Sequence, residues 1–476
     1  MLSILLNGAF VLAAAGTTAA RSRAFLYIDP CQERHHVLPA CEERGVACVL
    51  LHSTAAAATI LSDSNMDAGA AMEADDNGES LRERVGANTV PSAGSELSWA
   101  RDRLPADVEI VGVLCGSDGG LADAERLQHV LIPHRSNGLL PARRDKYLMC
   151  EAVRAAGLSA PAQCSPGTWT ELRRFLREEH KRYPIVLKPR RGQASVLVGL
   201  AHDEAQAQHM DAILRAPTCH ASIDTSETAA GDLNVVAQEY LDGDEFVVDT
   251  VSSAGEHKAL AIWRYDKGEM NGAPFVYFCD ELLPCEGPRE ESLVQYAFDA
   301  LDALGWRWGP CHIELKWVKA RDGQGTPTGT GHAVLVEINA GRWNGVDFKL
   351  LASIAYGADS YEATLDAYLD EIAWKELPNR PPPDLRGHAR LVKLVSPASG
   401  TVITPAAEVH AKRLSEMDSL VCFEPEATEP GEHVSTTVDL ATCAGYAHLL
   451  HADREVVDRD YRALRELQEN GLHELV

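Results

Sequence analysis

Apolar runs divide the beginning of the chain into a strand, a helix and a second strand. The run AFLYID from Ala24 to Asp29 predicts a strand, residues 34–44 predict a helix that ends at Gly45, and VACVLLH from Val46 predicts another strand. Short connections between such elements are typical of a β-α-β unit. We therefore expect a parallel sheet in a first domain that covers residues 24–140.

This periodic pattern is lost between residues 53 and 104, where Ala, Ser, Asp, Asn and Glu dominate. Such a composition has too few apolar positions to form a core of its own. We expect a flexible insertion here, with one short helix at most and no separate domain. The pattern returns with a strand from Val108, a glycine-containing turn and a helix over residues 121–129.

The rest of the chain predicts mixed α/β and α+β structure. A connector and an amphipathic helix end at Gly157, and a Gly/Thr hairpin loop is expected at 321–331. Strands are expected at 183–189, 235–253, 257–267, 309–318 and 332–340, and helices at 169–179 and 292–304. After the proline run at 381–383, strands and a terminal helix from about Arg454 form an α+β segment, residues 381–476, which we expect to close over the site.

Composition restricts the class of protein. A chain of 476 residues exceeds the usual size of one domain. The net charge of −26 argues against a nucleic-acid partner, which would need a basic surface. Beyond the N-terminal segment, no stretch is long and apolar enough to span a bilayer, so no membrane partner is expected. The twelve cysteines lack CxxC pairs, which argues against a zinc ribbon or a disulfide scaffold.

Residues 1–23 are an apolar extension or a targeting segment. Residues 2–20 carry no charge and end in small residues before Arg21 and Arg23. The alternative is an extension that packs on the first domain. We expect a cytoplasmic protein, with organelle targeting as the other interpretation.

Candidate metal ligands come from the run VLVEINAGRW, where Glu337 and Asn339 interrupt an apolar strand. Residues two apart on a strand share a face, and a buried carboxylate beside an amide needs a partner such as a divalent cation. A solvent-exposed strand end is the other explanation. In CHIELKW, His312 and Glu314 also share a face, and Glu314 can face the pair on the next strand. Glu314, Glu337 and Asn339 together could hold one or two Mg²⁺ ions with nucleotide phosphates.

Other polar residues could bind a nucleotide. Lys188 ends an apolar strand and could reach phosphate oxygens, and the cationic turn after it could cross a polyphosphate or be a solvated hairpin. Gln238 offers hydrogen bonds that suit an adenine edge, and the backbone of 239–241 could act as a hinge. Glu245 could accept from ribose hydroxyls or simply be solvated. Arg342 could stabilise a transferring phosphoryl group or clamp a substrate carboxylate.

In this order, the lysine, the loop, QEYLDGDEF, HIEL and VEINAGR resemble the ATP-grasp superfamily, especially its carboxylate–amine ligases related to amino-acid ligases and carnosine synthase. The resemblance covers residues 24–476. It implies an ATP-grasp fold with a Rossmann-like pre-ATP-grasp domain at 24–140, a nucleotide-binding domain at 141–380 and a C-terminal α+β lid segment at 381–476.

The resemblance also implies a role for each matching residue. It implies that Lys146 and Lys188 contact the phosphates, that Gln238 and the hinge Glu239, Tyr240 and Leu241 contact adenine, and that Glu245 contacts the ribose. It also implies that Glu314, Glu337 and Asn339 bind Mg²⁺ or Mn²⁺ and that Arg342 binds the acyl phosphate. Two departures stand out. The phosphate loop RRGQAS has only Gly192, and Trp343 and Asn344 replace the glycines that often follow the arginine, which suggests a differently shaped acceptor pocket.

The implied reaction is an ATP-dependent ligation. A carboxylate is activated to an acyl phosphate and attacked by an amine, with release of ADP and phosphate, and amino acids are the expected substrates. His312 is a candidate base, with an orienting role as the alternative, and Arg264 or Lys267 could bind a substrate carboxylate or lie on a solvated edge. A homodimer is one assembly that we consider. The alternative functions are a carboxylase-like ATP-grasp enzyme and a nucleotide-binding regulator without turnover.

Overall fold

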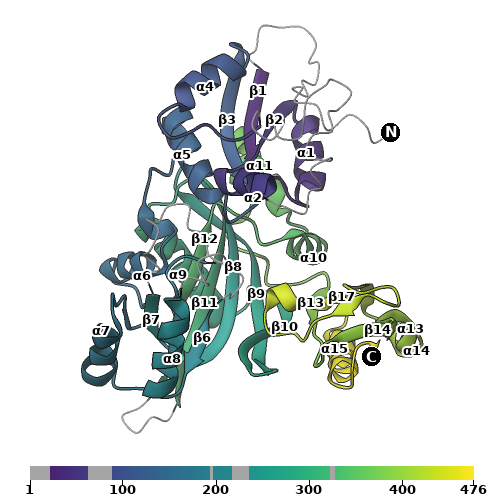
Figure 1. Ribbon diagram of the computed structural model, residues 1–476. Helices are drawn as coiled ribbons and strands as arrows, with labels where there is room; N and C mark the ends of the chain where they lie inside the picture. The colour runs from purple at the N-terminus through teal and green to yellow at the C-terminus, as the bar shows by residue number, and fades with distance from the viewer. Residues whose placement is uncertain (1–21, 63–87, 193–196, 217–234, 322–326) are drawn as a thin grey trace.

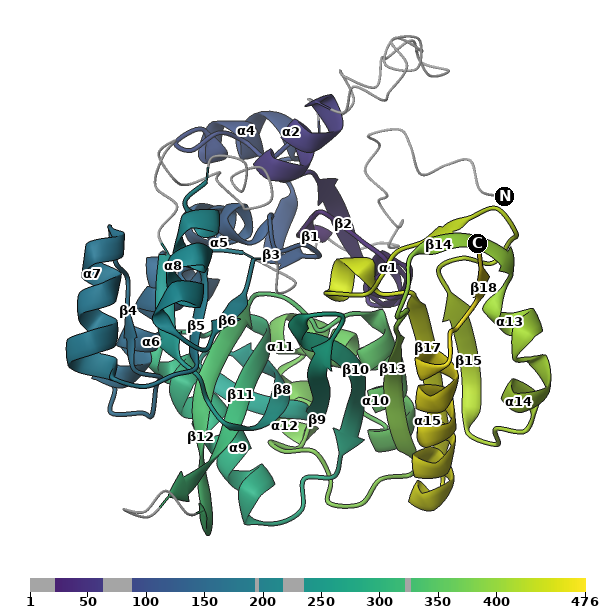
Figure 2. The same cartoon turned by 60° about the horizontal axis from the view of Figure 1, so that its bottom comes forward.

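The computed structural model describes residues 22–62, 88–192, 197–216, 235–321 and 327–476 (Figures 1 and 2). Four expectations fall wholly or partly on other residues. These are the targeting segment, the middle of the insertion, the middle of the phosphate loop and part of the hairpin loop at 321–331.

The first domain is built on a parallel sheet in the order β2-β1-β3. Its strands are β1 (Ser22–Ile28), β2 (Val46–Leu51) and β3 (Val108–Cys115), and α1 (Arg34–Glu43) connects the first two. The predicted β-α-β unit is therefore confirmed.

Both faces of β1 are covered, as a parallel sheet requires. Phe25 and Tyr27 belong to one apolar cluster, which also contains Trp343 from the far end of the chain. Leu26 and Ile28 belong to a second cluster on the opposite face, together with residues of helix α5 (Leu121–Leu131). The alternation of side chains along one strand thus connects the first domain to two different parts of the molecule.

The described ends of the insertion are helical, so the expectation of one short helix at most is wrong. Helix α2 (Thr54–Ser62) begins with an alanine run, and alanine has the highest helix propensity. Helix α4 (Glu96–Arg103) is attached to α5 because Arg126 forms ion pairs with Glu96 at 2.5 Å and Asp123 at 2.7 Å. Tertiary contacts therefore order residues whose composition favours disorder.

A connector leads from the first domain to a small four-stranded sheet. The connector contains η1 (Pro133–Arg135), η2 (Pro141–Arg143) and α6 (Lys146–Ala155). The sheet has the order β4-β7-β5-β6, with strands Gln163–Cys164, Val235–Glu239, Ile185–Pro189 and Gly199–Ala201. Its other elements are α7 (Trp169–Arg174), the π-helical turn η3 (Phe175–His180) and α8 (Glu204–Leu214). Leu172, Leu187 and Leu214 lie in the core that these elements share.

The largest sheet is antiparallel and has the order β12-β11-β8-β9-β10-β13-β17-β15. Its first five strands are β12 (Pro327–Ala340), β11 (Gly309–Arg321), β8 (Gly243–Ser253), β9 (Glu256–Met270) and β10 (Ala273–Leu283). Helix α9 (Pro288–Ala303) packs on one face. The hairpin loop expected at 321–331 is shorter, because Arg321 already pairs with Pro327.

The C-terminal segment extends this sheet instead of forming a separate layer. The strands β13 (His388–Leu394), β17 (Gly445–His451) and β15 (Leu420–Pro425) join it through β10. The terminal helix α15 (Arg454–Glu469) begins where the sequence predicts. The remaining elements are α10 (Val346–Tyr356), α11 (Ser360–Leu369), α12 (Glu371–Glu376), β14 (Gly400–Thr404), α13 (Ala406–Val409), α14 (Ala411–Ser415), β16 (His433–Val434), η5 (Leu440–Thr442) and β18 (Glu474–Leu475).

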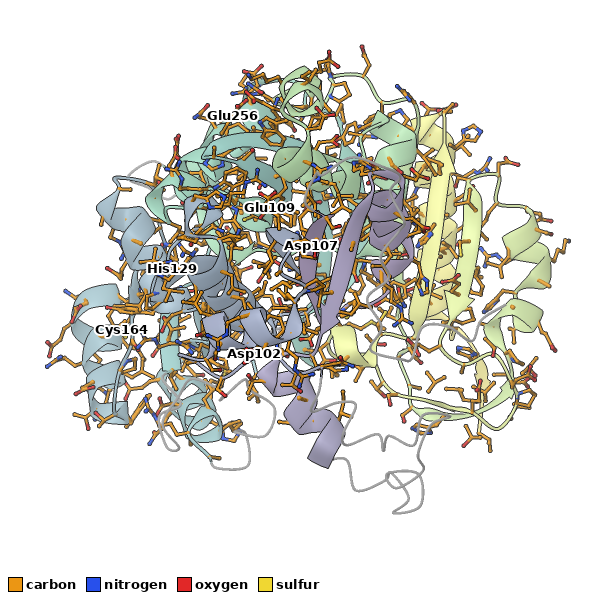
Figure 3. The ribbon with its side chains drawn as sticks, turned by 90° about the horizontal axis from the view of Figure 1, so that it is seen from above. Asp102, Asp107, Glu109, His129, Cys164 and Glu256 are labelled. Atoms are coloured by element: carbon orange, nitrogen blue, oxygen red, sulfur yellow. The ribbon has the colours of Figure 1, made fainter. Side chains whose placement is uncertain are left out.

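Acidic side chains are prominent on the surface. Asp102, Asp107 and Glu109 are exposed on the first domain (Figure 3). They are part of the net charge of −26, so cations inside the molecule act against an acidic background. Within the described parts of the chain, no helix combines the length and the apolar character that crossing a membrane requires.

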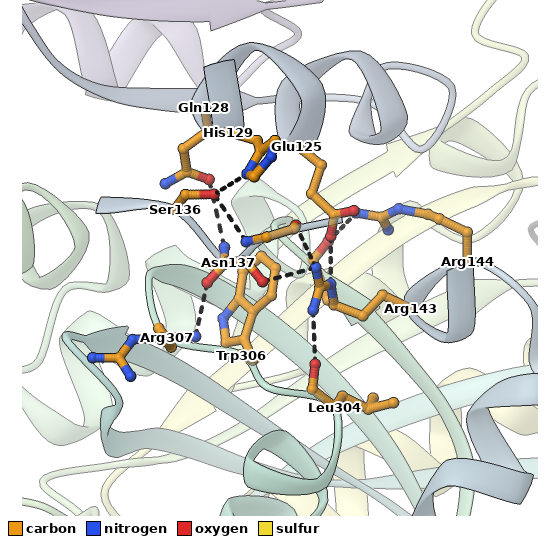
Figure 4. Close-up of polar contacts among 12 residues, drawn as sticks. Glu125, Gln128, His129, Ser136, Asn137, Arg143, Arg144, Leu304, Trp306 and Arg307 are labelled. Carbon is orange, nitrogen blue, oxygen red and sulfur yellow. Dashed lines mark hydrogen bonds and ion pairs between the residues drawn. The ribbon is translucent and has the colours of Figure 1, made fainter. Parts of the chain in front are cut away.

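A buried arginine joins the first domain to the large sheet (Figure 4). Arg143 is 1% exposed, and its Nε donates to Glu125 of α5 at 2.5 Å. Its Nη1 donates to the carbonyl of Leu304 after α9 at 2.7 Å, and its Nη2 donates to the carbonyl of Asn137 at 3.0 Å. The guanidinium also lies 5.9 Å from the ring centre of Trp306. One side chain therefore holds three separate segments of the chain together.

We predict that Arg143→Met destabilises the protein strongly. We expect the free energy of unfolding to fall by about 3–5 kcal/mol, because Glu125 would stay buried without its partner. Urea unfolding followed by tryptophan fluorescence measures the change. Arg101→Met is the control, since Arg101 is exposed and forms a surface ion pair with the exposed Asp102. Equal urea midpoints for the two variants would contradict the role of Arg143.

Candidate active site

One cavity of about 550 Å³ lies where the small sheet, the large sheet, the C-terminal segment and a loop of the first domain meet. Its volume is in the range typical of small-molecule sites. It contains all the predicted nucleotide-binding, metal-binding and catalytic residues: Lys146, Lys188, Gln238, Glu239, Tyr240, Leu241, Glu245, His312, Glu314, Glu337, Asn339 and Arg342. The structure therefore brings together residues that lie almost 200 positions apart in the chain.

The candidate metal ligands face one another across β11 and β12. Glu314 pairs in register with Glu337, as expected, and His312 pairs with Asn339. A β-bulge follows, because Leu315 pairs with Leu335 and skips Val336. The extra residue lets Leu335 and Ile338 both join the apolar core, while Val336, Glu337 and Asn339 line the cavity, which Leu335 also borders. The bulge thus directs the polar face of this strand toward the cavity.

Two lysines lie beside Glu337. Lys146 Nζ forms an ion pair with Glu337 Oε1 at 2.7 Å and donates to the carbonyl of Gly192 at 2.7 Å. Lys188, at the end of β5, is 6% exposed, and burial lowers the pKa of its ammonium although Glu337 opposes this shift. Two neighbouring cations on the wall of a cavity are a local source of positive charge, which could attract an anionic ligand.

His312 is held between two carboxylates. Its Nδ1 lies 3.0 Å from Asp249, its Nε2 lies 3.4 Å from Glu314, and the hydroxyl of Tyr265 is 3.2 Å from Nε2. Burial lowers the pKa of this imidazole, but the hydrogen bonds to Asp249 and Glu314 outweigh it and raise the pKa to about 9. An imidazolium has no free lone pair for a proton, so the geometry favours the orienting role over the role of a base.

The hinge between β7 and β8 leaves backbone outside the sheet. β7 ends at Glu239 and β8 begins at Gly243, and Tyr240 and Leu241 between them line the cavity. The amide nitrogen of Gln238 donates to Gln163 at 2.7 Å, which fixes the side chain in place. Backbone groups beside apolar walls suit one edge of a planar heterocycle.

Glu245 is 8% exposed and is not a solvated turn residue. It pairs with Lys267 and, at 3.2 Å, with Lys316. Lys267 also lies 3.8 Å from the ring centre of Tyr277, and the carboxylate of Glu245 helps to raise the pKa of its ammonium, against the effect of burial. Lys267 therefore lines the cavity, whereas Arg264 forms its ion pair with Glu281.

Arg342 meets a residue that the sequence analysis missed. Its Nη1 pairs with Oδ2 of Asp118, in the loop between β3 and α5. The available signal was the sequence GSDGG after a parallel strand, because ligands of α/β sheets bind outside the carboxyl ends of their strands. The first domain thus contributes directly to the cavity.

Asp280 and Lys393 form a second unpredicted pair, at the end of the cavity formed by the C-terminal segment. Asp280 on β10 is fully buried, and its Oδ2 lies 2.7 Å from Lys393 Nζ on β13. Within the described structure its Oδ1 has no hydrogen-bond partner, and burial raises the pKa of the carboxyl. Lys393 lies over the rings of Phe348 at 4.9 Å and Tyr446 at 5.2 Å. A carboxylate inside the apolar strand VYFCDELL was the sequence signal for this pair.

Trp343, one of the two departures from the family pattern, is an anchored wall of the cavity. It is 5% exposed, and its Nε1 donates to Thr364 Oγ1 at 2.9 Å. Its ring makes an edge-on contact with Tyr361 at 5.0 Å between centres. Asn344 lines the cavity beside it.

The donor set fits magnesium that shares its coordination with a ligand. In the described residues, no group of three His, Cys, Asp or Glu side chains could hold an ion alone. Two carboxylates and an amide oxygen are an incomplete set of hard donors, as Mg²⁺ uses when phosphates and water complete its shell.

Comparison with known proteins gives a consistent result. A family model described as an ATP-grasp domain matches residues 181–348. The chain is 26% identical to dapdiamide A synthase of Enterobacter agglomerans over 451 residues, which cover 94% of this chain and 96% of that protein. The L-amino acid ligase of Bacillus licheniformis is similar in structure, with a TM-score of 0.60, 19% identity, and coverage of 94% of this chain and 98% of that chain. Phosphoribosylglycinamide synthetase of Anaerococcus prevotii gives a TM-score of 0.54, 13% identity, and coverage of 96% and 99%. The fold is therefore the ATP-grasp fold.

Proposed function

We propose that this chain, a member of the ATP-grasp superfamily, is a ligase that joins a small carboxylate to a small amine at the expense of ATP. The carboxylate is activated as an acyl phosphate, the amine forms the amide, and ADP and phosphate are released. The observation that carries this proposal is a single cavity that has the neighbouring lysines Lys146 and Lys188 at one end and the separate Asp280–Lys393 pair at the other. The names of the related synthase and amino-acid ligase support an amide-forming reaction.

The nucleotide end of the cavity suits ATP with Mg²⁺ or Mn²⁺. Lys146 and Lys188 would contact phosphates, the 239–241 backbone and Gln238 would hold adenine, and Glu245 would hold the ribose. Glu314, Glu337 and Asn339 would hold the metal, which supplies charge neutralisation when bound. Arg342 would bind the acyl phosphate, since a guanidinium can donate two parallel hydrogen bonds to a phosphoryl group.

The other end of the cavity suits an amino acid. Asp280 offers a buried carboxylate oxygen without a hydrogen-bond partner, and an unpaired buried acceptor is costly. The ammonium of an amino-acid substrate would provide the missing donor. Asp280 pairs in register with Tyr265 of β9, the hydroxyl of Tyr265 lies 3.2 Å from His312, and His312 lies 3.4 Å from Glu314. An ammonium at Asp280 would therefore place the carboxylate of the same substrate near the candidate metal ligands. A homodimer stays a prediction.

We predict that Glu337→Gln reduces Mg²⁺-dependent ADP release by at least about 100-fold, because the metal's contribution is worth several kcal/mol. A coupled ADP assay with pairs of amino acids measures this, and EDTA should abolish the same signal in the wild type. The matched control is Glu371→Gln on the exposed surface of α12. Near-normal ADP release by Glu337→Gln would contradict the metal assignment. Dependence of ADP release on bicarbonate instead of an amine would contradict the ligase.

We predict that Asp280→Asn removes the preference for carboxylates that carry an amino group. In the wild type, alanine should be activated far better than propionate. In the variant, the ratio of alanine activation to propionate activation should fall by about tenfold to 100-fold, since a hydrogen bond to a charged group is worth about 1.5–3 kcal/mol. The double variant Asp280→Asn/Lys393→Met keeps the buried charges balanced and should show the same loss. An unchanged ratio in both variants would contradict the amino-acid end of the cavity.

A further inference from the structure

We infer that Asp118 takes the proton of the attacking ammonium, and that it becomes available when Arg342 exchanges it for the acyl phosphate. This inference rests on the proposed ligase function. It assigns to the first domain a catalytic residue that none of the motifs contains.

Hydrogen bonds and close backbone contacts hold the loop that carries Asp118. Ser117 Oγ donates to Asp29 Oδ2 at 2.6 Å, and the backbone nitrogen of Gly120 donates to Ser117 Oγ at 3.0 Å. A Cβ atom at Gly116 would lie 2.4 Å from the carbonyl oxygen of Asp29, and one at Gly120 would lie 2.8 Å from its carboxylate. The two glycines therefore allow a close approach that holds the carboxylate of Asp118 at the cavity.

Arg342 is brought to the same place from the end of β12. The preceding residue, Gly341, has φ of 94°, and its backbone nitrogen donates to the carbonyl of Pro310 at 2.8 Å. A Cβ atom at Gly341 would lie 3.2 Å from Leu121, the first residue of α5. The turn after β12 thus packs directly on the helix that follows the Asp118 loop.

The ion pair between Arg342 and Asp118 is incomplete. Oδ1 of Asp118 and Nε of Arg342 are both buried, and neither has a hydrogen-bond partner within the described structure. A phosphoryl group carries more charge than a carboxylate and can accept two parallel bonds from the guanidinium. An acyl phosphate near the metal ligands would therefore draw Arg342 away from Asp118.

Most other carboxylates of the cavity have a lysine or histidine partner of their own. These carboxylates are Glu245, Asp280, Glu314, Glu337 and Asp347. The partners of Glu314 and Glu337 belong to the candidate metal and phosphate sites, and both ring nitrogens of His312 are engaged, by Asp249 on one side and by Glu314 and Tyr265 on the other. Asp118 differs from these carboxylates because its partner, Arg342, would bind the acyl phosphate more strongly than it binds Asp118. Loss of a neighbouring cation makes a carboxylate a better proton acceptor.

The proposed step balances as follows. The carboxylate of Asp118 takes one proton from the acceptor ammonium, and the freed lone pair on nitrogen attacks the acyl carbon. The bond between that carbon and the phosphate oxygen breaks, and the second proton leaves the nitrogen for the departing phosphate. The products are the amide and hydrogen phosphate, and Asp118 then returns its proton to solvent.

Hydroxylamine tests this role because it is a neutral nucleophile at neutral pH and needs no base. The wild type should form a hydroxamate from ATP, an amino acid and hydroxylamine, and an amide when a second amino acid replaces hydroxylamine. Asp118→Asn should form the amide at least about 100-fold more slowly, the scale of general base catalysis, with hydroxamate formation close to that of the wild type. Arg342→Gln should lose both products, because it impairs the acyl phosphate itself.

Asp123→Asn on α5 is the matched control, since Asp123 pairs with Arg126 and does not line the cavity; it should form both products normally. Retained hydroxamate formation shows that Asp118→Asn is folded. Equal loss of both products by Asp118→Asn would overturn the inference and leave Asp118 as a residue that only positions Arg342. Undiminished amide formation would overturn it as well. A wild type that forms no hydroxamate from any carboxylate would instead overturn the proposed ligase function.

Discussion

The buried guanidinium of Arg143 is the constraint on which the arrangement of the site depends. Its charge is tolerable in the interior only if its donors are satisfied, and the acceptors come from α5, from the connector and from the end of α9. This requirement fixes α5 against the large sheet. The loop before α5 carries Asp118, and the turn after β12 carries Arg342. A network that does not itself line the cavity therefore helps to decide which two charges meet in it.

The cavity is nearly balanced in charge before any ligand arrives. Lys146 is paired with Glu337, Lys267 with Glu245, and Lys393 with Asp280. Each pairing lowers the free-energy cost of burying the lysine. In each pair the carboxylate could also bind a different cation in place of the lysine. A nucleotide with its metal would therefore replace internal ion pairs with ligand contacts. It would not bind to charges that lack partners. The acidic surface makes such local pairing more important.

Strand periodicity was enough to find one face of the site but not its full extent. Alternation placed Glu337 with Asn339 and opposite Glu314, and the register confirms this. The bulge at Val336 could not be predicted, because it arises from the need to bury Leu335 and Ile338 on one side. Asp118 and Asp280 were missed for another reason. Their partners lie 224 and 113 positions away along the chain, and no local pattern shows which distant cation will be beside a carboxylate.

Trp343 makes its wall of the cavity different from a glycine-lined one. Its ring belongs to the same apolar cluster as Phe25 and Tyr27 of the first domain, and its indole nitrogen is fixed by Thr364 of α11. Glycines at this position would leave the end of β12 free to follow its ligand. A large side chain buried in two other elements instead makes that end rigid, and Arg342 next to it can then change its partner only through its own side-chain torsions. The exchange between Asp118 and a phosphoryl group requires such a fixed backbone, because the two acceptors must compete for one guanidinium within reach of both.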